Sequence, residues 1–350
     1  MLALQLDAPH QPALLREIPT PEPAAGEVLV RLRAAALNHR DVWIQKGQYA
    51  GIKLPCTLGA DGAGEIAALG AGVEGWAVGA PVIIYPGVEW GTAQHAQGRS
   101  FRVLGMPDPG TFAEYIALPA HYVRPRPAHL DWAQAAALPL TSITAWETLF
   151  DRLDVRKPVP GAATAILIIG GAGGVGSIAI QLARQLTDLT VIATASRDET
   201  RSWVEDLGAH HVIDHRKPLA EQVEALGLGA PGFVFSTTHT DEHVAEIATL
   251  IAPQGRLALI DDPETLDISP LKQKSISVHW ELMYTRSLFQ TADMAEQGRI
   301  LDEVARLVDA GTVKTTLAEN FGRIDAANLR KAHARIESHT AKGKIVLEGF

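Results

Sequence analysis

Short apolar runs, interrupted by glycine and proline, follow one another through about the first 120 residues. These runs begin near Leu2, Glu27, Gly64, Ala80 and Ala113. Runs of this kind, bounded by turn residues, are typical of β-strands. The first part of the chain is therefore predicted to form a mostly β, barrel-like domain.

From about Trp132 the apolar residues recur at helical spacing, and the stretch that follows alternates strands with helices. The near-continuous apolar run Ala165–Gly170 predicts a buried strand. After it we expect helices at Ser177–Leu186 and Thr200–Leu207, and strands at Thr190–Ser196, His211–Ile213, Phe233–Ser236, Leu257–Ile260 and Ser277–Glu281. Such alternation needs crossover connections, which predict a doubly wound parallel sheet. A helix at Arg299–Val308 and an end strand at Gly343–Glu348 could rejoin the first domain.

Composition limits the class of protein. A chain of 350 residues, 47% hydrophobic and 20% charged, can bury a large core and is long enough for about two domains. The formal charge of −9, without a long cluster of Lys or Arg, argues against nucleic acid as a partner. No window reaches the roughly 18 apolar residues of a membrane span, and the start MLALQLDAPHQP lacks a basic segment, so we expect a cytoplasmic protein. Cys56 is the single cysteine, which excludes a disulfide framework within the chain.

A glycine loop follows the first buried strand of the second domain. Its sequence is Gly171-Ala172-Gly173-Gly174-Val175-Gly176, directly before a predicted helix. In this context Gly171 permits a tight turn, Gly173 lets backbone N–H groups approach a pyrophosphate, and Gly176 lets the helix pack on the sheet. The helix N-terminus then offers free donors and the positive end of its dipole to phosphate. The loop predicts a dinucleotide cofactor.

The choice of nicotinamide cofactor depends on the end of the next strand. Ser196 and Arg197 stand there and can donate to a 2′-phosphate, whereas a carboxylate would accept from a ribose 2′-OH. Asp198 follows directly and leaves NADH open. His215, after the third strand, either adds a donor near adenine or is a surface histidine. NADPH is favoured over NADH.

Several segments resemble the medium-chain dehydrogenase/reductase superfamily, and the similarity covers nearly the whole chain. They are LGADGAGEI at Leu58–Ile66, ALPLT at 137–141 with TAW at 144–146, and GKIVL at Gly343–Leu347. The resemblance implies an α/β plus mostly β fold. In it a GroES-like barrel domain (1–125 and 287–350) carries an inserted Rossmann domain with a doubly wound parallel sheet (126–286), and a cleft lies at the junction.

Two branches of the superfamily contribute to the resemblance. From about Pro158 onward, including Val278–Leu282 and Thr285–Met294, the chain looks closest to reductases labelled "zinc-type alcohol dehydrogenase-like". The first 150 residues look closer to a different branch. The resemblance also implies a homodimer, through edge pairing of the strand near Val278–Leu282.

Metal ligands are the main departure from the zinc enzymes of this superfamily. Those enzymes take catalytic zinc with a cysteine before the first-domain signature and a histidine inside it; the matching positions here are Asn38 and Ala60. Members with a structural zinc use four closely spaced cysteines, and the segment Gly87–Asp108 has none. We therefore expect no metal site, and the chain resembles the zinc-independent quinone oxidoreductase branch.

Two histidines in the second domain are candidate metal ligands. His239 and His243 lie four residues apart and would share one face of a helix. The polar sequence around them fits the start of a helix better, with Thr240 or Asp241 as its cap. A helix start is the favoured interpretation.

The resemblance also implies roles for particular residues. Tyr49 lies in the segment that lines the substrate side, where its phenol could hydrogen-bond or protonate a developing oxyanion, or simply pack at the barrel edge. Asn38 corresponds to a position that approaches the nicotinamide or its ribose. Thr141 resembles a cofactor contact, and Lys344 a residue that reaches a cofactor phosphate or the nicotinamide end. The backbone of Thr237–His239 and of Ile260, after two strands, would flank the nicotinamide; the expected cofactor contacts there are Thr237, His239 and Ile260.

The missing metal ligands favour one kind of chemistry. Hydride addition to an isolated ketone leaves a full alkoxide, which needs a Lewis acid or a good proton donor. A quinone or an α,β-unsaturated carbonyl spreads the new charge onto a remote oxygen. The sequence favours an NADPH-dependent quinone or enone reductase. Two alternatives remain, namely an alcohol dehydrogenase or carbonyl reductase with unusual zinc ligands such as His39, Asp41 or Asp61, and an NADPH-binding protein without turnover.

Overall fold

The computed structural model describes residues 1–49, 51–88, 102–289, 291–293 and 295–350. This part of the chain divides into two compact units. The β-rich unit comprises Met1–Leu140, Tyr284–Gly311 and Thr315–Phe350, and the α/β unit comprises Thr141–Met283 and Thr312–Lys314. The domain bounds expected from the sequence, 126–286 for the inserted domain, stay a prediction.

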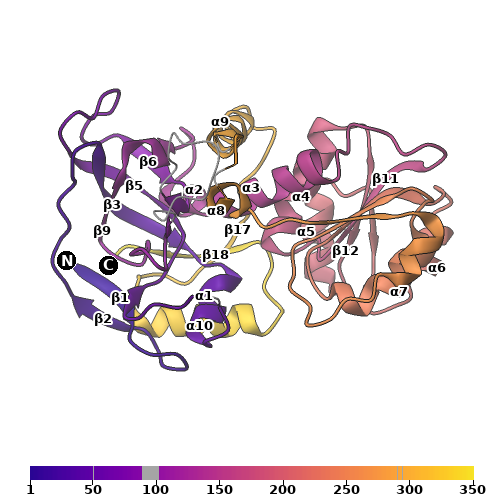
Figure 1. Cartoon of the computed structure of the whole chain (residues 1–350), viewed down its shortest axis with the longest axis horizontal. Helices are drawn as coiled ribbons and strands as arrows, with labels where there is room; N and C mark the ends of the chain where they lie inside the picture. The colour runs from indigo at the N-terminus through magenta and orange to yellow at the C-terminus, as the bar shows by residue number, and fades with distance from the viewer. Residues whose placement is uncertain (50, 89–101, 290, 294) are drawn as a thin grey trace. The chain divides into compact units, whose positions relative to one another are not determined.

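The β-rich unit is built from sheets that join both ends of the chain. Its strands are β1 (Leu2–Leu6), β2 (Leu14–Glu17), β3 (Glu27–Ala36), β4 (Cys56–Thr57), β5 (Asp61–Leu69), β6 (Pro81–Ile84), β7 (Gly87–Val88), β8 (Arg102–Val103), β9 (Tyr115–Pro119), β10 (Val123–Pro125), β17 (Leu317–Asn320) and β18 (Lys344–Glu348). The largest sheet has the order β10-β6-β5-β3-β18-β17, with β9 also on β3. The remaining sheets are β2-β1-β4 and β7-β8. Figure 1 shows the final strand, in yellow, in the same unit as the indigo strands.

Strand β3 is the centre of this unit because it pairs with three others. It lies antiparallel to β5, β9 and β18. Ala34, Ala35 and Ala36 at its end are fully buried, so the neighbouring strands pack close to its backbone. At the end of β3, Ala36 pairs with Val346 of β18 on one side and with Asp61 of β5 on the other. This pairing brings β18 and the start of β5 next to the end of β3.

Helices cover the β-rich unit at its sheet faces and edges. They are α1 (His39–Gln45), the 3-10 turn η1 (Ala120–Tyr122), α2 (Trp132–Ala136), α8 (Thr285–Phe289), α9 (Glu296–Asp309) and α10 (Ala326–Glu337). Side-chain caps fix the starts of two of them, since Asp131 accepts from the N–H of Gln134 and Asp325 from that of Asn328. The apolar face of α10 joins a core cluster with β1 and β18.

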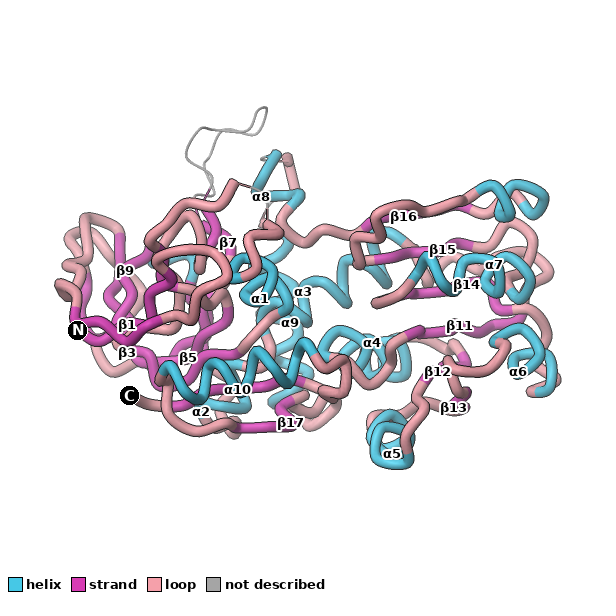
Figure 2. The backbone as a smooth tube through the Cα atoms, turned by 90° about the horizontal axis from the view of Figure 1, so that it is seen from below, coloured by secondary structure: helices cyan, strands magenta, loops and turns pink. Residues whose placement is uncertain are grey.

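The α/β unit is a six-stranded parallel sheet with helical crossovers. Its strands are β11 (Ala163–Ile169), β12 (Thr190–Thr194), β13 (His211–Ile213), β14 (Pro231–Ser236), β15 (Arg256–Leu259) and β16 (Ser277–Trp280), in the order β13-β12-β11-β14-β15-β16. Its helices are α3 (Pro139–Trp146, which begins in the β-rich unit), the π-helical turn η2 (Glu147–Arg152), α4 (Gly174–Leu186), α5 (Asp198–Asp206), α6 (Leu219–Ala225), α7 (Thr240–Leu250) and the 3-10 turn η3 (Ser269–Lys274). In Figure 2 the strand labels follow this ladder from β16 to β13. The expected doubly wound parallel sheet is confirmed.

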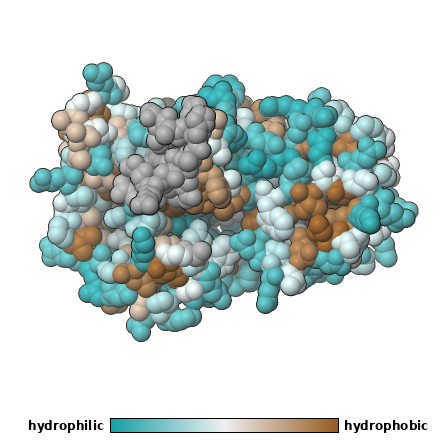
Figure 3. Space-filling view, in the orientation of Figure 1, coloured by the Kyte–Doolittle hydropathy of each residue, from teal (hydrophilic) through white to brown (hydrophobic). Residues whose placement is uncertain are grey.

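Apolar residues on helices and at the surface bear on membranes and on partners. In the part of the chain that is described, no helix is both long and apolar enough to cross a bilayer. Figure 3 shows apolar side chains gathered on the visible face of the α/β unit. Among the exposed large apolar residues, Trp280 and Leu282 lie on and just after β16, an edge strand of the sheet.

Candidate cofactor and active site

The glycine loop connects β11 to α4, as the sequence predicts. The left-handed turn residue is Gly170 (φ +76°), not Gly171, because the chain reverses one residue earlier than expected. Gly170 donates its N–H to Thr194 Oγ1 (3.0 Å) and accepts from the N–H of Gly173 (3.0 Å). At Gly171 the requirement is space, since a Cβ there would come within 2.9 Å of the Ala193 Cβ.

Gly176 and Gly173 have different surroundings. A Cβ on Gly176 would overlap the carbonyl oxygen of Gly170, so the first turn of α4 packs directly on the loop. A Cβ on Gly173, the N-cap of α4, would lie 3.4 Å from the same oxygen, which is ordinary contact. The loop is therefore tight on its inner side and open at Gly173, where the N-terminus of α4 with Gly174 and Val175 offers backbone donors.

The side chain of Arg216, which the sequence analysis did not single out, contacts the loop that follows β12. Arg216 donates from Nη2 to the carbonyl of Ser196 (2.7 Å) and forms an ion pair with Asp214 (Nη2 to Oδ2, 2.8 Å). Arg197 is the N-cap residue of α5, and its backbone is held by Thr200. Arg216 could have been found because the carboxyl ends of the neighbouring strands β12 and β13 meet at one edge of the sheet. His215 is exposed between the two members of this ion pair.

The carboxylate of Asp214 is strongly acidic. Hydrogen bonds from Arg216 lower the pKa of Asp214 to about 2. Both members of the ion pair are therefore charged at neutral pH. It fixes the guanidinium beside Ser196 and compensates part of its charge.

The ends of β14 and β15 form the opposite side of the loop. Thr237 donates its N–H (3.1 Å) and its hydroxyl (2.9 Å) to the carbonyl of Ile169. His239 is the N-cap residue of α7 in the left-handed conformation (φ 51°). Asp261, next to Ile260, accepts from the N–H (2.8 Å) and the hydroxyl (2.5 Å) of Thr240. The cap of α7 is thus supplied by Asp261 rather than by Thr240 or Asp241, because the carboxylate reaches across from the neighbouring strand.

The remaining residues singled out from the sequence are a cofactor contact and candidate metal ligands. Thr141 is buried on α3. Among the described residues no group of three or more His, Cys, Asp or Glu side chains could hold a metal ion, and this includes His239 and His243. Residues 89–101 of the segment Gly87–Asp108 lie outside the described residues, as do Gln290 and Met294 of the segment Thr285–Met294.

A buried polar cluster lies in the β-rich unit where β3, β5 and β18 meet. Asn38, at the N-cap of α1, donates from Nδ2 to Asp61 Oδ2 (3.0 Å). Lys344 donates from Nζ to Asn38 Oδ1 (2.7 Å), to Asp61 Oδ2 (3.2 Å) and to the carbonyl of Leu37 (2.7 Å). Asn38 is 8% exposed, Lys344 3% and Asp61 fully buried. Lys344, expected to reach a cofactor phosphate or the nicotinamide end, has all three N–H donors engaged within this unit.

Backbone donors complete the cluster. The second oxygen of Asp61 accepts from the N–H of Leu140 (2.9 Å). Asp41 accepts from the N–H groups of Asn38 (2.9 Å) and Gly59 (3.2 Å), which ties α1 to the turn before β5. Burial raises the pKa of Asp41, although Arg40 and these donors oppose the shift.

Tyr49 meets α1 through Arg40, a residue that the sequence analysis did not single out. The guanidinium is buried, donates to the carbonyls of Leu104 (2.8 Å) and Met106 (3.4 Å), and lies 5.2 Å from the ring centroid of Tyr49 and 5.7 Å from that of Tyr284. Burial raises the pKa of Tyr284, which keeps its phenol neutral. Tyr49 remains partly exposed, so of the two phenols it is the one that a small molecule can reach.

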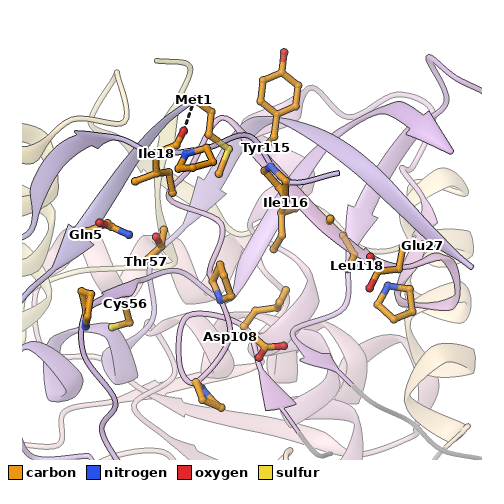
Figure 4. Close-up of a pocket in the computed structure, with 18 residues that line it drawn as sticks. Met1, Gln5, Ile18, Glu27, Cys56, Thr57, Asp108, Tyr115, Ile116 and Leu118 are labelled. Atoms are coloured by element: carbon orange, nitrogen blue, oxygen red, sulfur yellow. Dashed lines mark hydrogen bonds between the residues drawn. The ribbon is translucent and has the colours of Figure 1, made fainter. Parts of the chain in front are cut away.

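A separate cavity of about 240 Å³ lies elsewhere in the β-rich unit. Figure 4 shows Gln5, Cys56, Thr57 and Asp108 around it, and neither Asn38 nor Tyr49 lines it. Burial raises the pKa of the Cys56 thiol to about 11, which favours the protonated thiol at neutral pH. The cavity is therefore not lined by either of the residues that the sequence predicts to be catalytic.

Comparisons with known proteins identify the family to which the chain belongs. The model of the alcohol dehydrogenase GroES-like domain matches residues 24–128, and that of zinc-binding dehydrogenases matches residues 207–347. A zinc-type alcohol dehydrogenase-like protein of Staphylococcus aureus (strain MSSA476) is 32% identical over 93% of this chain and 92% of its own length. An NAD-dependent alcohol dehydrogenase of Saccharolobus solfataricus is 27% identical over 99% of both chains.

Solved structures extend the likeness to the whole fold. A Rhizobium etli CFN 42 protein described as a zinc-dependent alcohol dehydrogenase is 53% identical, with a TM-score of 0.89 over 100% of this chain and 98% of the other. An NAD-dependent alcohol dehydrogenase is 31% identical, with a TM-score of 0.87 over both whole chains. The chain belongs to the medium-chain dehydrogenase/reductase superfamily. Within it, the protein is a nicotinamide-dependent oxidoreductase with a GroES-like domain.

Proposed function

We propose that the protein transfers hydride from NADPH to a quinone or an α,β-unsaturated carbonyl, without catalytic zinc. The observation that carries this proposal is the cluster of Asn38, Asp61 and Lys344. The Lys344 ammonium donates to Asn38 Oδ1 and to Asp61 Oδ2. Asn38 is one of the two positions at which zinc enzymes of the superfamily are expected to have a ligand.

The residues present do not fit a zinc ion. One expected ligand position is Ala60, which has no donor atom, and the other is Asn38, whose Oδ1 accepts from Lys344 at 2.7 Å. A divalent cation bound to Asn38 and Asp61 would stand next to that ammonium and be repelled by it. Zinc also takes Cys, His or carboxylate ligands in a tetrahedral set, which this cluster does not offer.

A cluster whose residues do not fit zinc favours one class of acceptor. A saturated ketone would acquire a localised alkoxide, which this cluster has no cation free to stabilise. A conjugated acceptor delocalises that charge, so hydrogen bonds suffice. The Tyr49 phenol is proposed as the donor to the developing oxyanion, and the Asn38 amide as the donor that orients the nicotinamide side.

The coenzyme preference is proposed from the residues after β12 and β13. Ser196, Arg197 and Arg216 come together there, and the Arg216 side chain is 62% exposed. Its Nη1 group has no hydrogen-bond partner among the described residues, so it can donate to a 2′-phosphate. The compensating charge of Asp214 limits the preference rather than reversing it.

An acceptor panel tests the proposal. NADPH oxidation is measured with 1,4-benzoquinone, 2-cyclohexenone and, as the matched saturated control, cyclohexanone. We expect turnover of the quinone or the enone and a kcat/KM for cyclohexanone lower by at least about a hundredfold. Turnover of simple alcohols with NADP, with neither conjugated acceptor reduced, would contradict it.

The names of the relatives favour one alternative, an alcohol dehydrogenase with unusual zinc ligands. Stoichiometric zinc that is lost together with activity would support that alternative. Tight NADPH binding without hydride transfer to any acceptor would instead support a non-enzymatic binding protein.

A homodimer is proposed through β16. Within the described parts of the chain no further strand pairs with the outer side of this edge strand, and Trp280 and Leu282 are 55% and 49% exposed. Burial of these two side chains against a second copy would remove apolar surface from water.

A further inference from the structure

We propose that the ammonium of Lys344 is the resident cation of the buried cluster and a positioning residue for Asn38. In this role it holds the Asn38 amide in one orientation, so that Nδ2 points one N–H toward the reacting molecules. The inference rests on the proposed function and identifies the group that takes the place of a metal in it.

The first argument is the saturation of Lys344. An ammonium has three N–H donors and no acceptor, and here each donor has an oxygen partner at 2.7–3.2 Å. Such full coordination of a buried lysine is costly to assemble, since a buried charge must be paired and hydrogen-bonded. Lys344 and Asn38 lie 306 positions apart in sequence, so the fold brings the two chain ends together around this group.

The second argument is charge balance. The cluster and its neighbour Arg40 contain two buried cations, Lys344 and Arg40, and two buried carboxylates, Asp41 and Asp61. With both carboxylates ionised, the four formal charges cancel. A divalent metal ion added to this set would leave two positive charges uncompensated inside the protein.

The third argument concerns the orientation of the amide. An ammonium can only donate and a carboxylate can only accept, so Asn38 must turn Oδ1 to Lys344 and Nδ2 to Asp61. One N–H of Nδ2 is used by Asp61, and the second has no partner among the described residues. A flipped amide would face both partners with the wrong polarity. Lys344 and Asp61 together therefore fix the second N–H as a donor available to a ligand.

The experiment keeps the cluster neutral, because Lys344→Met alone would leave the Asp61 carboxylate buried and unpaired. The test variant is the double substitution Lys344→Met with Asp61→Asn. Its matched control is Lys331→Met, which removes an exposed lysine from α10. Folding is checked by circular dichroism, and coenzyme binding by the Kd for NADPH.

The decisive readout is a double-mutant cycle on benzoquinone reduction between this variant and Asn38→Ala. We expect the double variant to keep its Kd for NADPH within about twofold and to lose kcat by about 10- to 100-fold, while KM changes little. If Lys344 acts through Asn38, adding Asn38→Ala causes no further loss. A merely structural role would instead give multiplied effects.

The outcomes separate the two proposals. Unchanged kcat in the folded double variant, or losses that multiply with Asn38→Ala, would overturn the role of Lys344 while leaving quinone reduction intact. Zinc-dependent alcohol oxidation by the wild-type protein, with no reduction of conjugated acceptors, would overturn the proposed function itself. Lys331→Met is expected to match the wild type in every readout.

Discussion

At the scale of single residues, the coenzyme preference depends on opposed charges at the edge of the parallel sheet. Arg216 is fixed by Asp214 and by the carbonyl of Ser196, so it loses little side-chain entropy when it binds a phosphate. Arg197 lies on the adjacent loop. This pre-organised guanidinium predicts a binding difference that can be measured without knowledge of the acceptor.

Arg216→Gln is expected to raise the Kd for NADPH by about tenfold, the effect of losing one charge-assisted hydrogen bond. The Kd for NADH should remain within about twofold, because NADH has no 2′-phosphate. Both constants are obtained by fluorescence titration, and Lys331→Met is the control. Equal losses for the two coenzymes would place the role of Arg216 outside the 2′-phosphate site.

Asp214→Asn is expected to lower the free energy of unfolding at neutral pH. The pKa of Asp214 is depressed to about 2, so its contribution is complete above the unfolded pKa of about 3.9 and is lost as pH falls toward 2. Denaturant unfolding of both proteins should show a constant difference from pH 5 to 8 that shrinks below pH 4. A difference that grows on acidification has the wrong sign for this ion pair.

At the scale of elements, the tight contact between α4 and the glycine loop decides whether the loop keeps its shape. Gly176→Ala is expected to destabilise the protein by about 1–3 kcal/mol, because the added Cβ overlaps the Gly170 carbonyl. Gly173→Ala is the matched control, since it has room for a Cβ and should cost about 1 kcal/mol or less. Urea denaturation compares the two, and equal destabilisation would mean that the loop relaxes.

Local patterns predicted the elements well. The strand, glycine loop and helix from β11 to α4 lie consecutively in sequence, so their order and type follow from periodicity and turn residues. Short strands such as β2, β4 and β10 were not predicted, because two to four residues carry too little pattern. The shift of the turn from Gly171 to Gly170 is a boundary effect of one residue.

Contacts between distant segments were not predictable in the same way. The pairing of Lys344 with Asn38 and Asp61 follows from the register of β3, β5 and β18, which no local pattern contains. Arg216 and Asp261 were missed for the same reason, since each acts across neighbouring strand ends. The residue types of the site were visible in sequence, but their partners were not.

At the scale of the whole molecule, the exposed apolar residues of β16 predict assembly. Trp280→Glu is expected to convert a dimer into a monomer, because it places a charge where apolar surface would be buried. Multi-angle light scattering after size exclusion gives the mass directly. Ile268→Glu is the control, because Ile268 is 49% exposed but lies outside β16. This substitution should leave the mass unchanged. A wild-type protein that is already monomeric would contradict the proposed dimer.

The central claim is that hydride reaches a conjugated acceptor without a coordinated metal, because a lysine ammonium fills the cluster. The most direct test measures zinc in the purified protein by mass spectrometry, together with NADPH-dependent benzoquinone reduction before and after EDTA treatment. We expect far less than one zinc per chain and an unchanged rate. One zinc per chain, lost together with activity on chelation and restored with it, would contradict the account.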